Sequence, residues 1–185
     1  PMVATQIPSP VRVPPKQSRP LRPAALKERA LRLASTEIAY IDHPEFRKRH
    51  AESWLDALRP PARVHDSVRR ETASGLAFVA GLVRAPLLTP AEETYLFHLM
   101  NFRKSQAERW RRKIRPNSPD PALLNRIEAA MQEAVEIRNR IAEANLRLIV
   151  ATAKKLSHSL DQLSELISEG LVPILRAVEL FDVGR

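Results

Sequence analysis

The residue types that most often catalyse reactions or hold metal ions are few and scattered in this sequence. Its five histidines are His43, His50, His65, His98 and His158, and no two stand four residues apart around a glutamate, as a helical zinc site requires. There is no cysteine, which excludes disulfides and thiolate metal sites. No acid, base and nucleophile form a recognisable motif. We therefore expect a binding protein that is not an enzyme and uses no metal or cofactor.

The charged side chains supply the chemistry of binding, and they are unevenly distributed. The formal net charge of +9 indicates a polyanionic partner. Residues 1–35 and 101–126 each carry +6, whereas 36–71 carry 0, 72–100 carry −1 and 127–185 carry −2. The two basic islands could attract nucleic-acid phosphates. A solvated basic surface explains them at least as often.

Composition predicts an all-α fold, because glycine is rare and helix-forming residues are abundant. Residues 1–23 hold seven prolines and should form a disordered basic arm. Residues 24–71 should be a helical segment of unknown role, and residues 72–185 a helical bundle in which 101–126 form a basic extension and a proline-rich break. No apolar run reaches the roughly 20 residues that span a bilayer, and no signal peptide is visible, so we expect a cytoplasmic protein without a membrane partner.

The N-terminal half should contain three helices before the bundle's main elements. Residues 24–42 carry apolar residues at helical spacing up to the break at His43-Pro44. A second helix is expected over 44–58. Ser74 is a suitable N-cap for a third that begins at Gly75.

Start signals in the C-terminal half are clearer. Thr89, Pro90 and Glu92 form the sequence pattern of a capping box, and Asp120-Pro121 repeats the N-cap and N1 pattern. These signals predict one helix from Pro90 and a long one over about 122–156, followed by a last helix that starts at Leu160 or Asp161 and contains Gly170 and Pro173. The positions of the long helix expected to face inward are Leu124, Ile127, Met131, Ala134, Ile141, Asn145, Leu148 and Thr152, and those of the last helix include Ala177 and Phe181.

Several separately placed motifs resemble one known family. The runs IAEANLRLIV (141–150), AKK (153–155), LISEG (166–170) and RAVELFD (176–182) stand in the order and spacing of regions 2.1 and 2.2 of bacterial sigma-70 family RNA polymerase sigma factors. The match runs from Arg138 to Asp182 without a gap. LLTPAEE (87–93) is similar to region 1.2, and the basic extension after it is most like that of planctomycete-type members.

The resemblance implies the N-terminal part of a transcription initiation factor that binds core RNA polymerase and directs promoter-specific initiation. Its partner would be the clamp-helix coiled coil of the β′ subunit, with promoter DNA in the full-length context, and an anti-sigma factor as a further candidate. The family's polymerase-binding positions fall here on Leu146, Ile149, Ser164, Glu165, Ser168, Glu169, Leu171 and Leu175. Its DNA-proximal positions, together with the basic extension, give weak contacts at Phe78, Val79, Arg103, Lys104, Arg109, Arg111, Arg112 and Lys113.

The sequence also departs from the family pattern. Leu171 and Pro173 replace residues that are polar or small in the family, Ser168 replaces a glutamine, and a proline within a helix costs about 3 kcal/mol or more unless a kink accommodates it. The chain ends at Arg185, before the aromatic segments that open promoters. Two alternatives therefore stay open. One is a stand-alone sigma-like protein that occupies core polymerase without promoter melting. The other is an enzyme built in a helical bundle, for which no motif is present.

Overall fold

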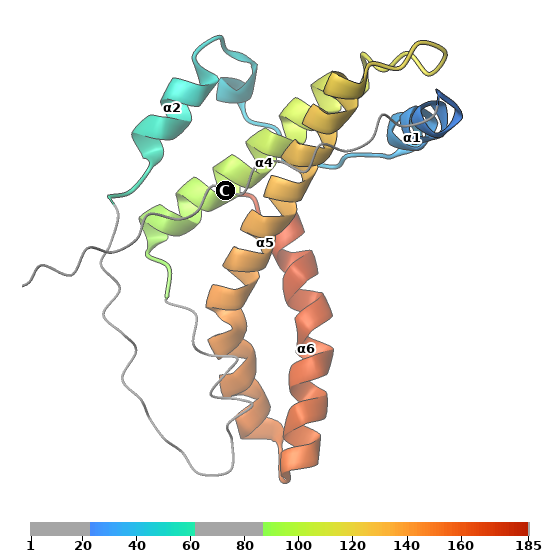
Figure 1. The fold of residues 1–185 in the computed structure, drawn as a ribbon. Helices are drawn as coiled ribbons and strands as arrows, with labels where there is room; N and C mark the ends of the chain where they lie inside the picture. Colours follow the sequence, from blue (N-terminus) through green and yellow to red (C-terminus); the bar gives the residue numbers. More distant parts are fainter. Residues whose placement is uncertain (1–22, 62–86, 185) are drawn as a thin grey trace, which may run out of the picture.

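The computed structural model describes residues 23–61 and 87–184, and within these ranges the chain is helical, with no strand (Figure 1). The predicted all-α class is confirmed. None of the described helices is long and apolar enough to cross a membrane. The elements are α1 (Pro23–Ser35), the 3-10 helix η1 (Pro44–Arg47), α2 (Ala51–Leu58), α4 (Pro90–Arg111), α5 (Pro121–Leu156) and α6 (Leu160–Leu180).

Helix α5 is the central helix, on which α4 and α6 pack, and its start and end follow the predicted signals. The Asp120 side chain accepts a hydrogen bond from the Ala122 amide at 2.9 Å, and Pro121 occupies N1, where a missing amide costs nothing. The helix ends at Leu156, and Ser157 to Ser159 turn the chain back so that α6 runs antiparallel beside α5 (Figure 1). Ser159 caps α6 by accepting a hydrogen bond from Gln162.

Helix α4 crosses the first half of α5 and begins with the predicted capping box. The Thr89 hydroxyl accepts from the Glu92 amide, and the Glu92 carboxylate accepts from the Thr89 amide at 2.7 Å. The core between α4, α5 and α6 is apolar: Leu96, Phe97, Met100, Ala134, Ile137, Ile141, Ala142 and Val178. A second cluster, with Ala107 and Ile127, closes the other end of the α4–α5 pair.

The apolar face of α5 changes direction along the helix, which overturns two predictions. Leu148 and Thr152 were expected to face inward, but Leu148 is 67% exposed and Thr152 is exposed too. The buried positions are instead Leu146, Val150 and Ala153. Up to Ala142 the helix packs in the core shared with α4, and from Val150 onward it packs on Leu163 and Ile167 of α6. Because α5 packs first on α4 and then on α6, its buried positions do not form one continuous stripe. A single stripe extended along the whole helix therefore places Leu148 and Thr152 wrongly.

Two inward predictions for α6 are also wrong. Ala177 is exposed, and Phe181, which follows the helix, is 53% exposed. Phe181 keeps one aromatic contact, since its ring lies 4.7 Å from that of Phe97. Pro173 lies within α6 on its exposed side, and the helix continues past it to Leu180.

The N-terminal segment differs from its prediction in where its helices end. The helix expected over 24–42 stops at Ser35, and residues 36–43 are not helical. Tertiary contacts decide this: Ile38 is buried beside Ala107 and Ile127, and the Ile41 amide donates to the Asn101 side chain of α4 at 2.9 Å. The helix expected over 44–58 is divided into η1 and α2. The cap at Ser74 and the helix after it lie outside the described residues.

Candidate functional site

The candidate site is the side of α6 that faces away from α5. Its acidic and hydroxyl side chains lie at helical spacing, and all four of Ser164, Glu165, Ser168 and Glu169 are exposed. The Ser168 hydroxyl donates to the Ser164 carbonyl within the helix at 2.9 Å. Among the described residues neither glutamate has an ion pair. The two carboxylates are therefore available to a basic partner.

The opposite side of α6 is fixed in the core, so the acidic side cannot rotate freely. Leu163 and Ile167 are buried against Val150 and Ala153 of α5. Gly170 brings the two helices close together: a Cβ atom placed on it would lie 2.7 Å from Cγ2 of Ile149. A glycine within a helix usually has a packing or close-approach reason, and this contact supplies it. Packing of this kind pre-organises a docking surface and lowers the entropy lost on binding.

The apolar residues predicted for the same site lie deeper. Leu146 is 8% exposed, and Ile149 is half-buried against the cluster that includes Val150. Leu171 and Leu175 are half-buried, and Leu175 packs against the main core. The structure thus brings the eight predicted positions to the α5–α6 pair, but only the four polar ones are fully on its surface.

Val172 was missed by the sequence analysis. It is 71% exposed and follows Glu165 and Glu169 by seven and three residues, so it shares their side of α6. That spacing could have identified it. The apolar contact beside the glutamates is therefore more accessible at Val172 than at Leu171 or Leu175.

The second predicted set, the basic residues of α4, is mostly occupied by internal partners. Lys104 is 6% exposed and pairs with Glu179 of α6, which also lies 3.5 Å from Arg138 of α5. Arg103 lies 2.8 Å from Glu133. The sequence could not show these pairs, because their partners are 30 or more residues away in α5 and α6.

The end of α4 is arranged around one carboxylate. Hydrogen bonds from Arg111, and then from Arg112, hold the pKa of Glu108 below its ordinary value despite its burial. Arg111 also donates to the Ala34 carbonyl at 2.6 Å. Arg109 and Lys113 are exposed. Phe78 and Val79, the other predicted DNA-proximal residues, lie outside the described residues.

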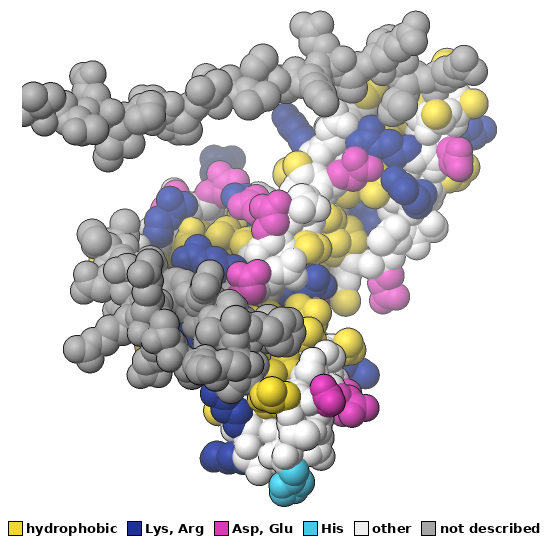
Figure 2. Space-filling view, turned by 60° about the horizontal axis from the view of Figure 1, so that its bottom comes forward, with side chains coloured by type: hydrophobic (Ala, Val, Ile, Leu, Met, Phe, Trp, Pro, Cys, Tyr) yellow, Lys and Arg dark blue, Asp and Glu magenta, His cyan; other side chains and the backbone are white. Residues whose placement is uncertain are grey.

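Lys and Arg side chains lie at several separate places on the face shown in Figure 2. This distribution differs from the single basic patch or stripe that is typical of nucleic-acid-binding proteins.

The five histidines form no metal centre where the structure describes them. Residues 23–61 and 87–184 contain no group of three or more His, Asp or Glu side chains placed to hold a metal ion. Asn145, expected to face inward, is half-buried and donates to the Ile141 carbonyl of its own helix at 2.9 Å.

The described residues thus form an all-α fold with a long central helix, α5, and a packed α5–α6 hairpin that presents carboxylates. Comparison with known proteins makes this more specific. RNA polymerase sigma factor SigA4 of Synechococcus elongatus is 31% identical over 117 residues, 63% of this chain and 35% of SigA4. The principal sigma factor HrdC of Streptomyces coelicolor is 35% identical over 65 residues, and SigA of Listeria monocytogenes is 42% identical over 64.

These relatives are RNA polymerase sigma factors, and their similarity confirms the resemblance to the sigma-70 family. It spans about a third of SigA4, 19% of HrdC and 16% of SigA. No protein-family model and no solved structure matches the chain. The similarity to planctomycete-type members stays a prediction.

Proposed function

We propose that this chain acts in transcription initiation as part of a sigma factor, and that it binds core RNA polymerase through the exposed acidic side of α6. The observation that carries the proposal is the pair Glu165 and Glu169. Both carboxylates are exposed, share one side of a helix whose other side is fixed in the core, and have no ion pair among the described residues. A basic coiled coil, such as the β′ clamp helices of the polymerase, is the partner that this surface fits.

Val172 adds the apolar part of the contact. Interfaces gain most of their affinity from a few residues that become buried near the centre, and exposed charges at the edge mainly set orientation and association rate. In this arrangement Val172 becomes buried on binding, and the half-exposed parts of Leu171 and Leu175 extend the apolar area. Leu146 and Ile149 then act indirectly, by holding α5 against α6.

The experiment is a titration of the chain against bacterial core RNA polymerase near physiological salt, in competition with a housekeeping sigma factor. Glu169→Lys should keep the helical circular dichroism spectrum and abolish competition. The matched control is Glu143→Lys, the same charge reversal at an exposed position of α5, which should bind as the parent does. If Glu169→Lys competes as well as the parent, the docking assignment is wrong.

DNA contact is the weaker part of the proposal and belongs to the end of α4 rather than its middle. Lys104 and Arg103 are held by Glu179 and Glu133, which leaves Arg109 and Lys113 as the better candidates among the predicted residues. Each phosphate contact removed should lower the salt dependence of binding by about one unit of slope. Arg109→Ala should show this loss on duplex DNA, and Lys104→Ala, in chains that remain folded, should not.

A further inference from the structure

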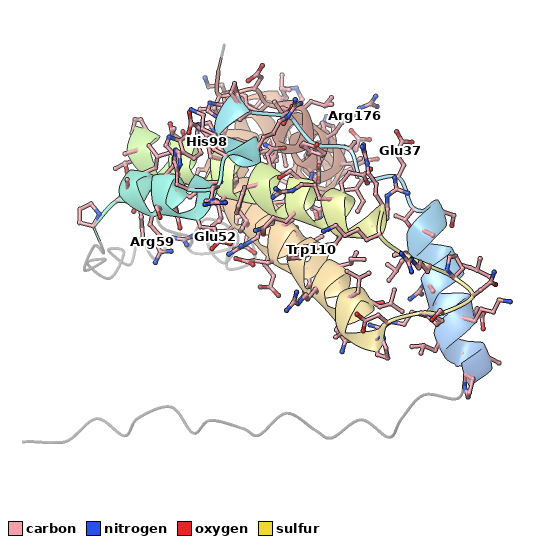
Figure 3. All side chains as sticks on the ribbon, turned by 90° about the horizontal axis from the view of Figure 1, so that it is seen from above. Glu37, Glu52, Arg59, His98, Trp110 and Arg176 are labelled. Atoms are coloured by element: carbon pink, nitrogen blue, oxygen red, sulfur yellow. The ribbon has the colours of Figure 1, made fainter. Side chains whose placement is uncertain are left out.

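The 3-10 helix η1 and helix α2 lie on the side of α4 that faces away from α5, and three rings hold them there. His43, just before η1, stacks on Trp54 of α2 with ring centroids 4.9 Å apart and an angle of 17° between the planes. The edge of His98 from α4 meets both: its centroid lies 5.1 Å from His43 and 5.2 Å from Trp54. Figure 3 shows His98 beneath η1 and α2. Two imidazoles therefore meet at the contact between the N-terminal segment and α4.

The first of these imidazoles forms part of the cap of η1. Nδ1 of His43 accepts a hydrogen bond from the Glu45 amide at 3.3 Å, and this bond caps η1. An imidazole nitrogen that accepts carries no proton, and a protonated imidazole has donors only. Protonation of His43 therefore removes the cap of η1.

The second imidazole is poorly placed to become charged. Burial, and then the proximity of His43, hold the pKa of His98 below its ordinary value, while Asp182, beyond the end of α6, acts in the opposite direction. Of the acids near His43 in sequence, Asp42 pairs with Arg47, and Glu45 is engaged by Lys48 and lies 3.9 Å from His50. Attraction between a charged His43 and the Trp54 ring offsets part of the free energy lost when protonation breaks the cap of η1. Charging His98 is therefore unfavourable while η1 and α2 are docked on α4.

The lowered pKa of His98 determines how the stability of the contact between the segment and α4 changes with pH. In the unfolded chain a histidine takes up its proton near pH 6.5 (about the ordinary value). His98 in the folded chain takes it up only at lower pH, so between these two values the chain binds more protons when the segment is released than when it is docked. The contact is stable above about pH 6.5 and weakens as pH falls below it.

The remaining contacts of the segment are few and partly polar. Phe46, Leu55 and Phe102 form a small apolar cluster. Two hydrogen bonds also join the segment to α4, from the Ile41 amide to Asn101 and from Gln106 to Glu52. Polar groups of this kind can exchange their partners for water at little cost. Release of the segment would therefore leave the core between α4, α5 and α6 intact.

We propose that residues 41–58 are a proton-sensitive cover on α4: acidification charges the His43 and His98 pair, releases η1 and α2, and exposes the surface of α4 that carries Asn101, Phe102 and Gln106. This device is independent of the polymerase-docking side of α6, so its failure would leave the proposed function standing.

The test is amide hydrogen exchange of the full chain, corrected for intrinsic rates, between about pH 7.5 and about pH 5. An eight-residue helix such as α2 does not persist once released. We expect protection of the α2 amides to fall by roughly tenfold or more over this range, while the amides of α5 stay protected. In the Trp110→Phe background, emission of Trp54 should shift to longer wavelength over the same interval.

His98→Gln should abolish most of this pH dependence, and the double variant with His43→Gln should abolish all of it. His158→Gln, at an exposed position between α5 and α6, is the matched control and should leave the transition unchanged. Equal α2 protection at both pH values in the parent would overturn the proposal. So would a transition that persists in the double variant, because the protons would then act elsewhere.

Discussion

Gly170→Ala sets two effects of opposite sign against each other at the contact between α5 and α6. Alanine is the better helix former, which alone would raise the free energy of unfolding by about 1 kcal/mol. The new Cβ would however lie 2.7 Å from Cγ2 of Ile149, closer than packed carbon atoms approach. Overpacking of this kind costs about 1–3 kcal/mol. We therefore expect a net loss of up to about 2 kcal/mol, since the steric term is the larger.

Combining Gly170→Ala with substitutions of Ile149 tests whether the steric contact causes the loss. Ile149→Ala removes the Cγ2 atom, and in that background Gly170→Ala should become stabilising by about 1 kcal/mol. Ile149→Val keeps Cγ2, and there the substitution should still destabilise. Urea denaturation followed by circular dichroism measures all variants, with an unchanged m-value as the sign of comparable transitions. Stabilisation by Gly170→Ala in the parent chain would refute the close contact.

Five further substitutions test other parts of the packing by the same denaturation assay. Lys104→Ala should lower the free energy of unfolding by about 2–4 kcal/mol, because a buried partner of Glu179 is lost. Arg112→Ala should cost less than about 1 kcal/mol, because Arg112 is exposed and Glu108 keeps its pair with Arg111; equal effects would contradict the burial of Lys104. Ile141→Asp should unfold the bundle while Leu148→Asp leaves it folded, since Ile141 is 0% and Leu148 67% exposed, and the reverse order would mean that the face of α5 is assigned wrongly. Thr89→Ala should cost about 1 kcal/mol through loss of the capping box, and no loss would argue against that cap.

The helix boundaries that the sequence predicted correctly depend on local chemistry. Thr89, Pro90 and Glu92 satisfy amides within one turn of each other, and Asp120 with Pro121 does the same for α5. Such signals act over three or four residues and need no tertiary structure. The position of Gly170 was likewise informative, because an unfavourable glycine within a helix indicates a close neighbour.

The predictions that failed depended on distant contacts. Nothing in residues 24–42 signals a helix end at Ser35, because the extended stretch after it is fixed by Asn101, some sixty residues later. Leu148 was assigned inward because the buried face of α5 was taken as continuous, whereas the helix packs on α4 first and then on α6. The cluster of His43, Trp54 and His98 joins three separate segments and leaves no local pattern in the sequence.

The sequence predicted only part of the candidate site, because the rest depends on contacts between distant segments. The exposed acids Glu165 and Glu169 follow from helical spacing together with the family resemblance. The depth of Leu146 and the internal pairing of Lys104 follow from the packing of α4 and α6 on α5. Charge counted along the sequence therefore overstated the basic surface of α4.

The competition titration with core RNA polymerase tests the central claim most directly. The account predicts that the parent chain and Glu143→Lys displace a housekeeping sigma factor with equal affinity, and that Glu169→Lys, folded as judged by circular dichroism, does not. Equal competition by Glu169→Lys, or none by a folded parent chain, would contradict it.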